Sequence, residues 1–340
     1  MEMSVKLFGV ALDALDDPER VALKQAYIEA SATGRLRPGM PLDPYDAISP
    51  IIAQRLAGSI ELCGKLDLPG WLTPRPPVED AHLVDSVRYR EFIDNDEIRT
   101  WAEECSRFVE RVILPDVPCM IAVDHAMTAG PLRALASRHD PRETAVVIID
   151  SHFDAIPAGH RALSKKHLPC GAANCGSFLA GLLDERVILP ENLFVAGVSD
   201  YPIPGVADVY RKAYNSFINR GVTVIPKIEA DGSALIEKLE YALQRSDCSR
   251  LYVSLDADAG ACMCMNAVRF MDTEGLDEET IIGLARMMRE LLNSDRFEIA
   301  GLDVVEVDVH LLDLADIDGA PDRTRRICAD FITTLLGKDI

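Results

Sequence analysis

The chain has 340 residues, of which 48% are hydrophobic, so it can bury a large core and is too apolar to be a disordered protein. It carries 35 lysine and arginine residues against 55 aspartate and glutamate residues, and its net charge of −20 argues against nucleic acids and anionic membrane surfaces as partners. No apolar stretch reaches the roughly 18–20 residues that a membrane-spanning helix needs, so we expect no membrane association.

The N-terminal segment predicts a first strand and not an export signal. Its short apolar run is interrupted by Asp13, Asp16 and Asp17, and it has neither a basic lead nor a small-residue cleavage site. The nine cysteines are an odd number scattered along the chain, which favours reduced thiols over a disulfide framework. We therefore expect a cytoplasmic protein.

Short aliphatic runs alternate with helix-like segments along the chain. The runs are typical of strands buried on both faces, and they span 119–123, 145–149, 193–198, 222–225, 251–255 and 299–307. Helices are predicted at 131–139, 176–185, 205–219, 232–245 and 277–293. Residues 35–80 are rich in proline and glycine and predict loops with one or two helices. This order predicts a mostly parallel sheet wrapped by helices, in one domain over residues 1–340.

Acidic residues and histidines follow four of the predicted strands. They are Asp124 and His125 after 119–123; Asp150, His152 and Asp154 after 145–149; Asp256 and Asp258 after 251–255; and Glu306, Asp308 and His310 after the segment GLDVV. Ligands collect outside the carboxyl ends of parallel strands, and residues two apart in an extended segment face the same side. We therefore expect several of these side chains to converge.

Six of these residues form a candidate metal site: His125, Asp150, His152, Asp154, Asp256 and Asp258. Carboxylate oxygens mixed with imidazole nitrogens suit Mn²⁺, and less specifically Fe²⁺, Ni²⁺, Co²⁺ or Zn²⁺. Four carboxylates in one pocket repel one another, whereas two dications roughly 3.5 Å apart cancel their charge and make a hydroxide nucleophile available. Each motif alone could be a turn or a helix cap, but three of them at separate strand ends favour a two-metal hydrolytic site.

The order and spacing of these motifs resemble the ureohydrolase superfamily, the arginase and agmatinase family. The family pattern of GGDHS, DAHxD, SxDxD and an ExNP-like glutamate corresponds here to VDHAM, DSHFD, SLDAD and VEVDV, over roughly residues 119–310. The resemblance implies a three-layer α/β fold with a mostly parallel central sheet, and a binuclear manganese centre that hydrolyses a guanidino or amidino carbon–nitrogen bond. It also implies a homo-oligomer, a trimer or a hexamer.

The resemblance assigns roles to individual residues. It implies one ion on His125 and Asp154, a second on His152 and Asp258, and bridging carboxylates from Asp150 and Asp256. Glu306 matches the family glutamate that orients a substrate guanidinium, and an internal salt bridge is its alternative role.

The sequence also departs from the family pattern. The first motif lacks its glycine pair and its serine, and Cys175 in NCGSF stands where the family carries a proton-transferring histidine in HGTPF. His160 or His167 could replace that histidine, with His167 the nearer match, although both could be solvated loop residues. Cys175 could act as an acid or base if its pKa were depressed, or be a small buried residue.

Further residues of the same loop are candidates for substrate binding. Arg161, Lys165, Lys166 and His167 form a basic cluster that could receive a substrate carboxylate or could be a solvated face. We take Arg161 and Asn174 as substrate-binding candidates. Cys262 and Cys264 follow the third metal motif, where thiolate ligands would favour Zn²⁺ and a structural role is the alternative.

Three hypotheses remain open. The first is a manganese-dependent hydrolase of a small guanidino or amidino compound that releases urea or a related amide. The second is a metal-dependent deacetylase or amidohydrolase on the related fold, which would use one zinc and an adjacent histidine pair that this sequence lacks. The third is a metal-binding relative without catalytic activity.

Overall fold

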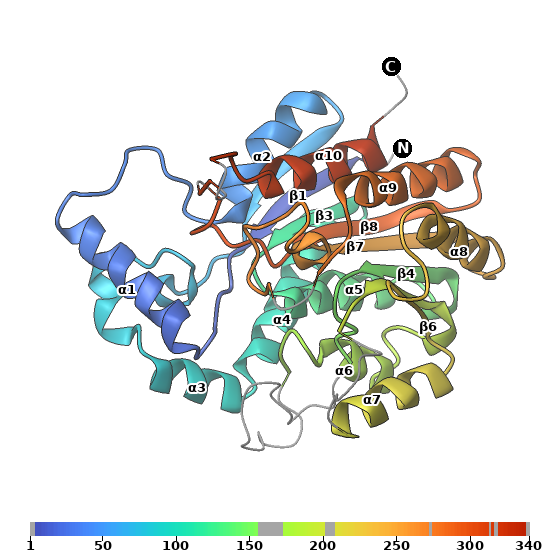
Figure 1. Cartoon of the computed structure of the whole chain (residues 1–340), viewed down its shortest axis with the longest axis horizontal. Coiled ribbons are helices and arrows are strands. Elements are labelled where there is room, and N and C mark those ends of the chain that lie inside the picture. The colour runs from blue at the N-terminus through green and yellow to red at the C-terminus, as the bar shows by residue number, and fades with distance from the viewer. Residues whose placement is uncertain are drawn as a thin grey trace.

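A parallel sheet of eight strands forms the centre of the molecule. The computed structural model describes residues 4–155, 173–200, 208–271, 274–312, 314–315 and 319–337. Within these ranges the strand order is β2-β1-β3-β8-β7-β4-β5-β6, and all neighbouring strands run parallel (Figure 1). The strands are β1 Val5–Val10, β2 Ile60–Lys65, β3 Val117–Ala122, β4 Thr144–Ile149, β5 Leu193–Val198, β6 Thr223–Pro226, β7 Arg250–Asp256 and β8 Glu298–Val305.

Helices cover both faces of the sheet, and a hydrophobic core lies under each layer. The core of one face includes side chains of α2 Pro44–Arg55, α8 Ser233–Gln244, α9 Glu278–Asn293 and α10 Thr324–Leu336. The core of the other face includes side chains of α1 Pro18–Ala32, α3 Ser86–Asp94, α4 Glu97–Phe108, α5 Ala129–Ala136, α6 Phe178–Asp184 and α7 Asp208–Asn219. This is the expected three-layer α/β fold, with a sheet that is wholly and not only mostly parallel.

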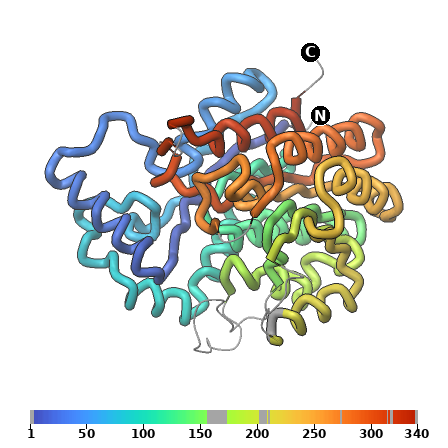
Figure 2. Tube along the Cα trace, viewed as in Figure 1, coloured from blue at the N-terminus to red at the C-terminus, as the bar shows by residue number. Residues whose placement is uncertain are grey.

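Distant parts of the chain pack together around this sheet. Figure 2 shows α2, near the N-terminal end of the chain, beside α10, near its C-terminal end. An ion pair between Arg55 and Asp330 joins the two helices. No helix in the described ranges is both long and apolar enough to cross a membrane.

Local sequence signals explain where several helices begin. Asp17, Asp43 and Asp85 precede α1, α2 and α3, and each side chain accepts a hydrogen bond from an amide of the first turn. Asp277 caps α9 in the same way, and Glu278 and Glu279 in its first turn suit the positive end of the helix dipole. The helix predicted at 277–293 therefore begins where its acidic residues indicate.

The predicted elements agree with the structure except between residues 35 and 80, but the helices α1, α3, α4 and α10 were not predicted. The six aliphatic runs correspond to β3 to β8, and the five predicted helices correspond to α5 to α9. The segment 35–80 contains the helix α2, as expected, but also the strand β2, so our prediction of loops and helices alone was wrong. β2 lies at the edge of the sheet and exposes Glu61, Leu62 and Lys65, so it lacks the continuous apolar run by which buried strands are recognised.

The topology brings the chemically interesting strand ends together. β3, β8, β7 and β4 are consecutive neighbours at the centre of the sheet, and their carboxyl ends lie at the same edge. The strands β3 and β4 follow each other in the chain, yet β8 and β7 separate them in the sheet. Open parallel sheets bind their ligands at such a position.

Candidate metal centre

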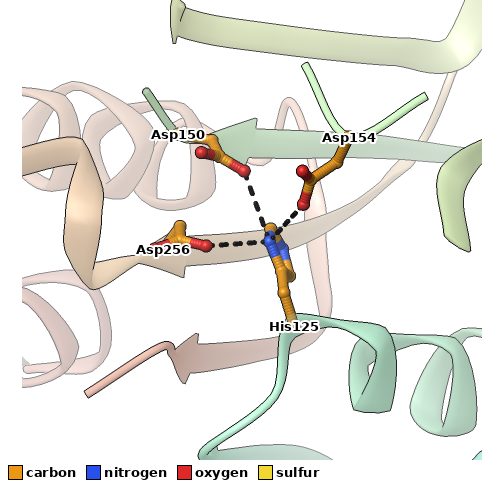
Figure 3. A group of neighbouring side chains, drawn as sticks. All are labelled: His125, Asp150, Asp154 and Asp256. Carbon is orange, nitrogen blue, oxygen red and sulfur yellow. Dashed lines mark ion pairs between the residues drawn. The ribbon is translucent and has the colours of Figure 1, made fainter. Parts of the chain in front are cut away.

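The first group of candidate ligands surrounds the ring of His125. Its Nδ1 atom lies 3.3 Å from Oδ2 of Asp150, 2.9 Å from Oδ2 of Asp154 and 3.0 Å from Oδ2 of Asp256. Figure 3 shows the three carboxylates directed at this ring, Asp150 and Asp154 from the segment after β4 and Asp256 from the end of β7. All four side chains are buried. Four potential ligand atoms thus converge on one point, as the sequence predicts.

The second group shares Asp150 with the first. His152 places Nδ1 3.5 Å from Oδ1 of Asp150 and 3.2 Å from Oδ2 of Asp258. The potential ligand atoms within each group lie within 4.8 Å of one another. Asp150 therefore occupies the position between two sites that the resemblance implies, whereas Asp256 joins only the first group. The assignment of each residue to one ion stays a prediction.

Each aspartate that follows a strand stabilises its own turn while it faces the cluster. Oδ1 of Asp150 accepts a hydrogen bond from the amide of His152 at 2.7 Å, and Oδ1 of Asp256 accepts one from the amide of Asp258 at 2.8 Å. In both residues the other oxygen, Oδ2, faces His125. Asp256 therefore satisfies the turn interpretation and the ligand interpretation with different oxygens, whereas Oδ1 of Asp150 also lies 3.5 Å from Nδ1 of His152.

Two residues at the site have strained backbones. Asp154 has φ 43° and Glu306 has φ 60°, in the left-handed region that residues other than glycine seldom adopt. Such conformations cost free energy and persist where the surrounding structure imposes them, commonly at functional sites. The surrounding structure therefore holds both residues in this conformation.

Polar partners behind the cluster orient its ligands. Nε2 of His125 lies 3.1 Å from Oγ of Ser254, which leaves Nδ1 to face the carboxylates. The hydroxyl of Ser151 donates a hydrogen bond to Oδ1 of Asp258 at 2.9 Å. Partners of this kind set the orientation and the basicity of metal ligands.

The charge balance of the cluster fits dications. Burial, followed by the charge of Asp150, raises the pKa of Asp154 to about 7. Burial and the neighbouring carboxylates also raise the pKa of Asp256 above its usual range. In addition, Nδ1 of His125 and Oδ2 of Asp150 are buried without a hydrogen-bond partner among the described residues. Buried like charges, and buried ligand atoms that make no hydrogen bond, are what two bound dications would neutralise and satisfy.

We expect the metal-free protein to lose stability as the pH rises from about 4 to about 8. Burial raises the pKa of Asp154 to about 7 and that of Glu306 to about 8, so the folded protein holds both protons more tightly than the unfolded chain. Their contribution is complete below the unfolded pKa values near 4 and is lost as the pH passes the folded values. Burial by itself raises the pKa of Asp13, but the charges of Lys24 and Arg269 outweigh it and leave the pKa lowered, so Asp13 acts below this window.

Thermal unfolding between pH 5 and pH 8, with and without Mn²⁺, measures this effect. The melting temperature of the metal-free protein should fall by a few degrees across the range, and Mn²⁺ should stabilise the protein more at pH 8 than at pH 5. A metal-free melting temperature that rises over this range would contradict the charge balance described above.

Glu306 lies beside the cluster and is held by an arginine that our sequence analysis missed. Its Oε1 accepts a hydrogen bond from the amide of His125 at 2.7 Å. Nη1 of Arg269 lies 3.0 Å from Oε2 of Glu306 and 3.2 Å from Oδ2 of Asp124. Arg269 is the only charged residue in the segment 259–271, AGACMCMNAVRFM, and an isolated charge in an apolar segment is the signal that could have identified it.

Cys175 lies next to Glu306 and Asp124, and potential ligand atoms of the three residues lie within 4.8 Å of one another. Burial, followed by the charges of Asp124 and Glu306, raises the pKa of the Cys175 thiol well above its usual range. The thiol is therefore protonated at neutral pH, so the depressed pKa that an ionised Cys175 would require is not found. Asn174 uses its main-chain carbonyl to begin α6, accepting hydrogen bonds from the amides of Ser177 and Phe178.

The other predicted site residues lie apart from the cluster or outside the described residues. His160, Arg161, Lys165, Lys166 and His167 belong to the latter group. Asp308 pairs with Arg20, and Nε2 of His310 lies 2.9 Å from the carbonyl oxygen of Pro74. Within the described part of the chain, neither Cys262 nor Cys264 joins a candidate metal group, since their thiols face the carbonyl oxygens of Met271 and Leu276.

Comparisons with known proteins agree with this fold. The model of the arginase family matches residues 54–337. The structure of arginase from Bacillus cereus superposes with a TM-score of 0.64 at 17% identity, and the match covers 99% of each chain. Proclavaminate amidino hydrolase from Streptomyces clavuligerus superposes with a TM-score of 0.60 at 19% identity, over 98% of this chain and 91% of that one.

Formimidoylglutamase from Bacillus subtilis superposes with a TM-score of 0.61 at 17% identity, over 99% of this chain and 87% of that one. No curated protein matches the sequence. At these identities the structural likeness establishes the fold, whereas the family model covers most of the chain. The protein therefore belongs to the arginase family.

Proposed function

We propose that this protein is a binuclear metal-dependent hydrolase that cleaves a carbon–nitrogen bond of a small guanidino or amidino compound and releases urea or a related amide. The convergence of six candidate ligands at the carboxyl ends of the central strands carries the proposal. They are His125, Asp150, His152, Asp154, Asp256 and Asp258. We expect Mn²⁺ as the metal, with Ni²⁺, Co²⁺ or Zn²⁺ as alternatives.

The protein's own residues have separate tasks in this reaction. When bound, two dications would lower the pKa of water so that hydroxide is available near neutral pH. The carboxylate of Glu306, held by the amide of His125, would accept a hydrogen bond from the substrate's nitrogen. The leaving amine needs a proton, and the imidazole of His167 would supply it.

A metal count combined with a product assay tests this proposal. The protein is incubated with a panel of guanidino and amidino compounds, once with Mn²⁺ and once with Ni²⁺, and the released urea or amide is measured. We expect two ions per chain and product from at least one compound. One bound zinc with deacetylation would favour the deacetylase alternative, and two ions without product would favour an inactive relative.

We also propose a cytoplasmic protein that assembles as a trimer or a hexamer. Eight of the nine cysteines lie in the described residues and all eight are free thiols, which is consistent with a reducing compartment. The oligomer is implied by the family resemblance. Sedimentation equilibrium of the purified chain would measure the subunit number.

A further inference from the structure

Arg269 places a guanidinium group of the chain itself on the carboxylate of Glu306. Its Nη1 atom lies 3.1 Å from Oε1 and 3.0 Å from Oε2 of Glu306. The same nitrogen lies 3.1 Å from the carbonyl oxygen of Val123 and 3.2 Å from Oδ2 of Asp124. Arg269 is 5% exposed and Glu306 is 1% exposed, so the pair is shielded from water.

The backbone holds this guanidinium in place. The amide of Arg269 donates a hydrogen bond to the carbonyl oxygen of Glu306 at 3.0 Å, and the amide of Asp308 donates one to the carbonyl oxygen of Ala267 at 2.9 Å. An antiparallel bridge between Val268 and Val307 lies between these bonds. Because Arg269 is paired with the segment that carries Glu306, its main chain stays beside Glu306, and its guanidinium is held there by the contacts with Glu306, Val123 and Asp124.

The contacts of Arg269 limit what Glu306 can still bind. A carboxylate has about four acceptor positions. In Glu306, Oε1 accepts from the amide of His125 and from Arg269, and Oε2 accepts from Arg269. About one position on Oε2 therefore remains. A substrate guanidinium that pairs side-on needs a free position on both oxygens.

We infer that Arg269 determines substrate specificity, because it occupies Glu306 from within the chain and disfavours guanidino relative to amidino substrates. This inference rests on the proposed function. A substituted guanidinium carries five N–H donors and a substituted formamidinium carries three, so a guanidinium buries more unpaired donors where one acceptor remains. Each unpaired donor costs binding free energy, and the native site favours the group with fewer donors.

Two ligands with the same aliphatic chain test this inference. Agmatine carries a guanidinium, and the formamidine of the same diamine, N-(4-aminobutyl)formamidine, lacks only one amino group. Their affinities for the Mn²⁺-loaded full chain are measured by titration calorimetry at low temperature, with hydrolysis followed separately. We expect the wild-type protein to bind the formamidine more tightly than agmatine.

The variant R269M should remove this preference. It frees both oxygens of Glu306 while it fills the volume of the arginine stem, so agmatine should bind about tenfold more tightly or better than to the wild type. The double variant R269M/E306Q is the control. It should lose this gain, because the glutamine side chain has one oxygen acceptor and cannot accept both hydrogen bonds of a side-on guanidinium. Circular dichroism and metal content show whether each variant is folded and loaded.

The outcomes separate this inference from the proposed function. Binding of both ligands with a ratio that R269M leaves unchanged overturns the inference and leaves the proposed function intact. Absence of hydrolysis for every amidino and guanidino compound overturns the proposed function, and the inference with it. If R269M does not fold, the ratio of the wild-type affinities for the two ligands decides. Binding of agmatine that is equal to or tighter than that of the formamidine overturns the inference.

Discussion

Asp256→Asn is expected to abolish hydrolysis and to reduce metal affinity by more than about a hundredfold. Substitution of a residue that only hydrogen-bonds to a metal ligand commonly lowers metal affinity 10–100-fold, and loss of a ligand itself should lower it further. Oδ2 of Asp256 is buried and lies 3.0 Å from Nδ1 of His125, in the first group of candidate ligands. Asparagine keeps the oxygen that accepts the hydrogen bond from the amide of Asp258. The turn should therefore persist while the charge that attracts the dications is lost.

Elemental analysis after dialysis against Mn²⁺ and the product assay measure the two effects. Asp247→Asn is the matched control, because Asp247 is exposed and lies just before the opposite end of β7. The control should keep both metal content and activity. Without metal, Asp256→Asn should be at least as stable as the wild type at pH 8, since burial and neighbouring carboxylates raise the pKa of Asp256. Wild-type activity in Asp256→Asn would contradict the assigned role.

Gly275→Ala is expected to destabilise the protein by about 1–3 kcal/mol or more and to weaken metal binding. A Cβ atom at this position would lie 2.3 Å from the carbonyl oxygen of Ala259 and 2.7 Å from the amide nitrogen of Ala261. Both contacts are with backbone, which cannot move aside as the end of a side chain can. The amides of Gly275 and Leu276 also donate hydrogen bonds to this turn, which directly follows Asp258. The substitution should therefore displace a candidate ligand.

Gly181→Ala is the matched control for this substitution. Gly181 lies inside α6, and among the described residues no atom outside the backbone of its own helix lies within 4 Å of the Cβ that alanine would add. Alanine is preferred over glycine within a helix by roughly 0.5–1 kcal/mol, so this variant should be slightly more stable than the wild type. Urea denaturation and titration with Mn²⁺ compare the two variants. Equal stability and equal metal affinity in Gly275→Ala would show that the loop is not as closely packed as described.

The central strands and the cluster were predictable from sequence for the same reason. A strand that is buried on both faces must be a continuous apolar run, and a polar residue directly after it then marks the carboxyl end of the strand. Asp150, Asp256 and their neighbours follow this rule, and in the structure they converge. A charged residue at each of these buried strand ends was informative, because a buried charge is costly unless it is paired or binds a metal.

The features that sequence reasoning missed depend on contacts between distant segments. β2 is an exposed edge strand, and only its pairing with β1 identifies it as part of the sheet. Arg269 is recognisable as an isolated charge, but its partner Glu306 is 37 residues away and becomes its neighbour through a backbone pairing of irregular segments. No periodicity encodes such a contact, so the structure was needed to find that Glu306 is already paired.

Anomalous diffraction at the manganese absorption edge, from crystals of the full chain soaked in Mn²⁺, tests the central claim most directly. We predict two peaks per chain, one among His125, Asp150, Asp154 and Asp256 and the other beside Asp150, His152 and Asp258. No peak at these residues, or a single ion elsewhere on the chain, would contradict the account.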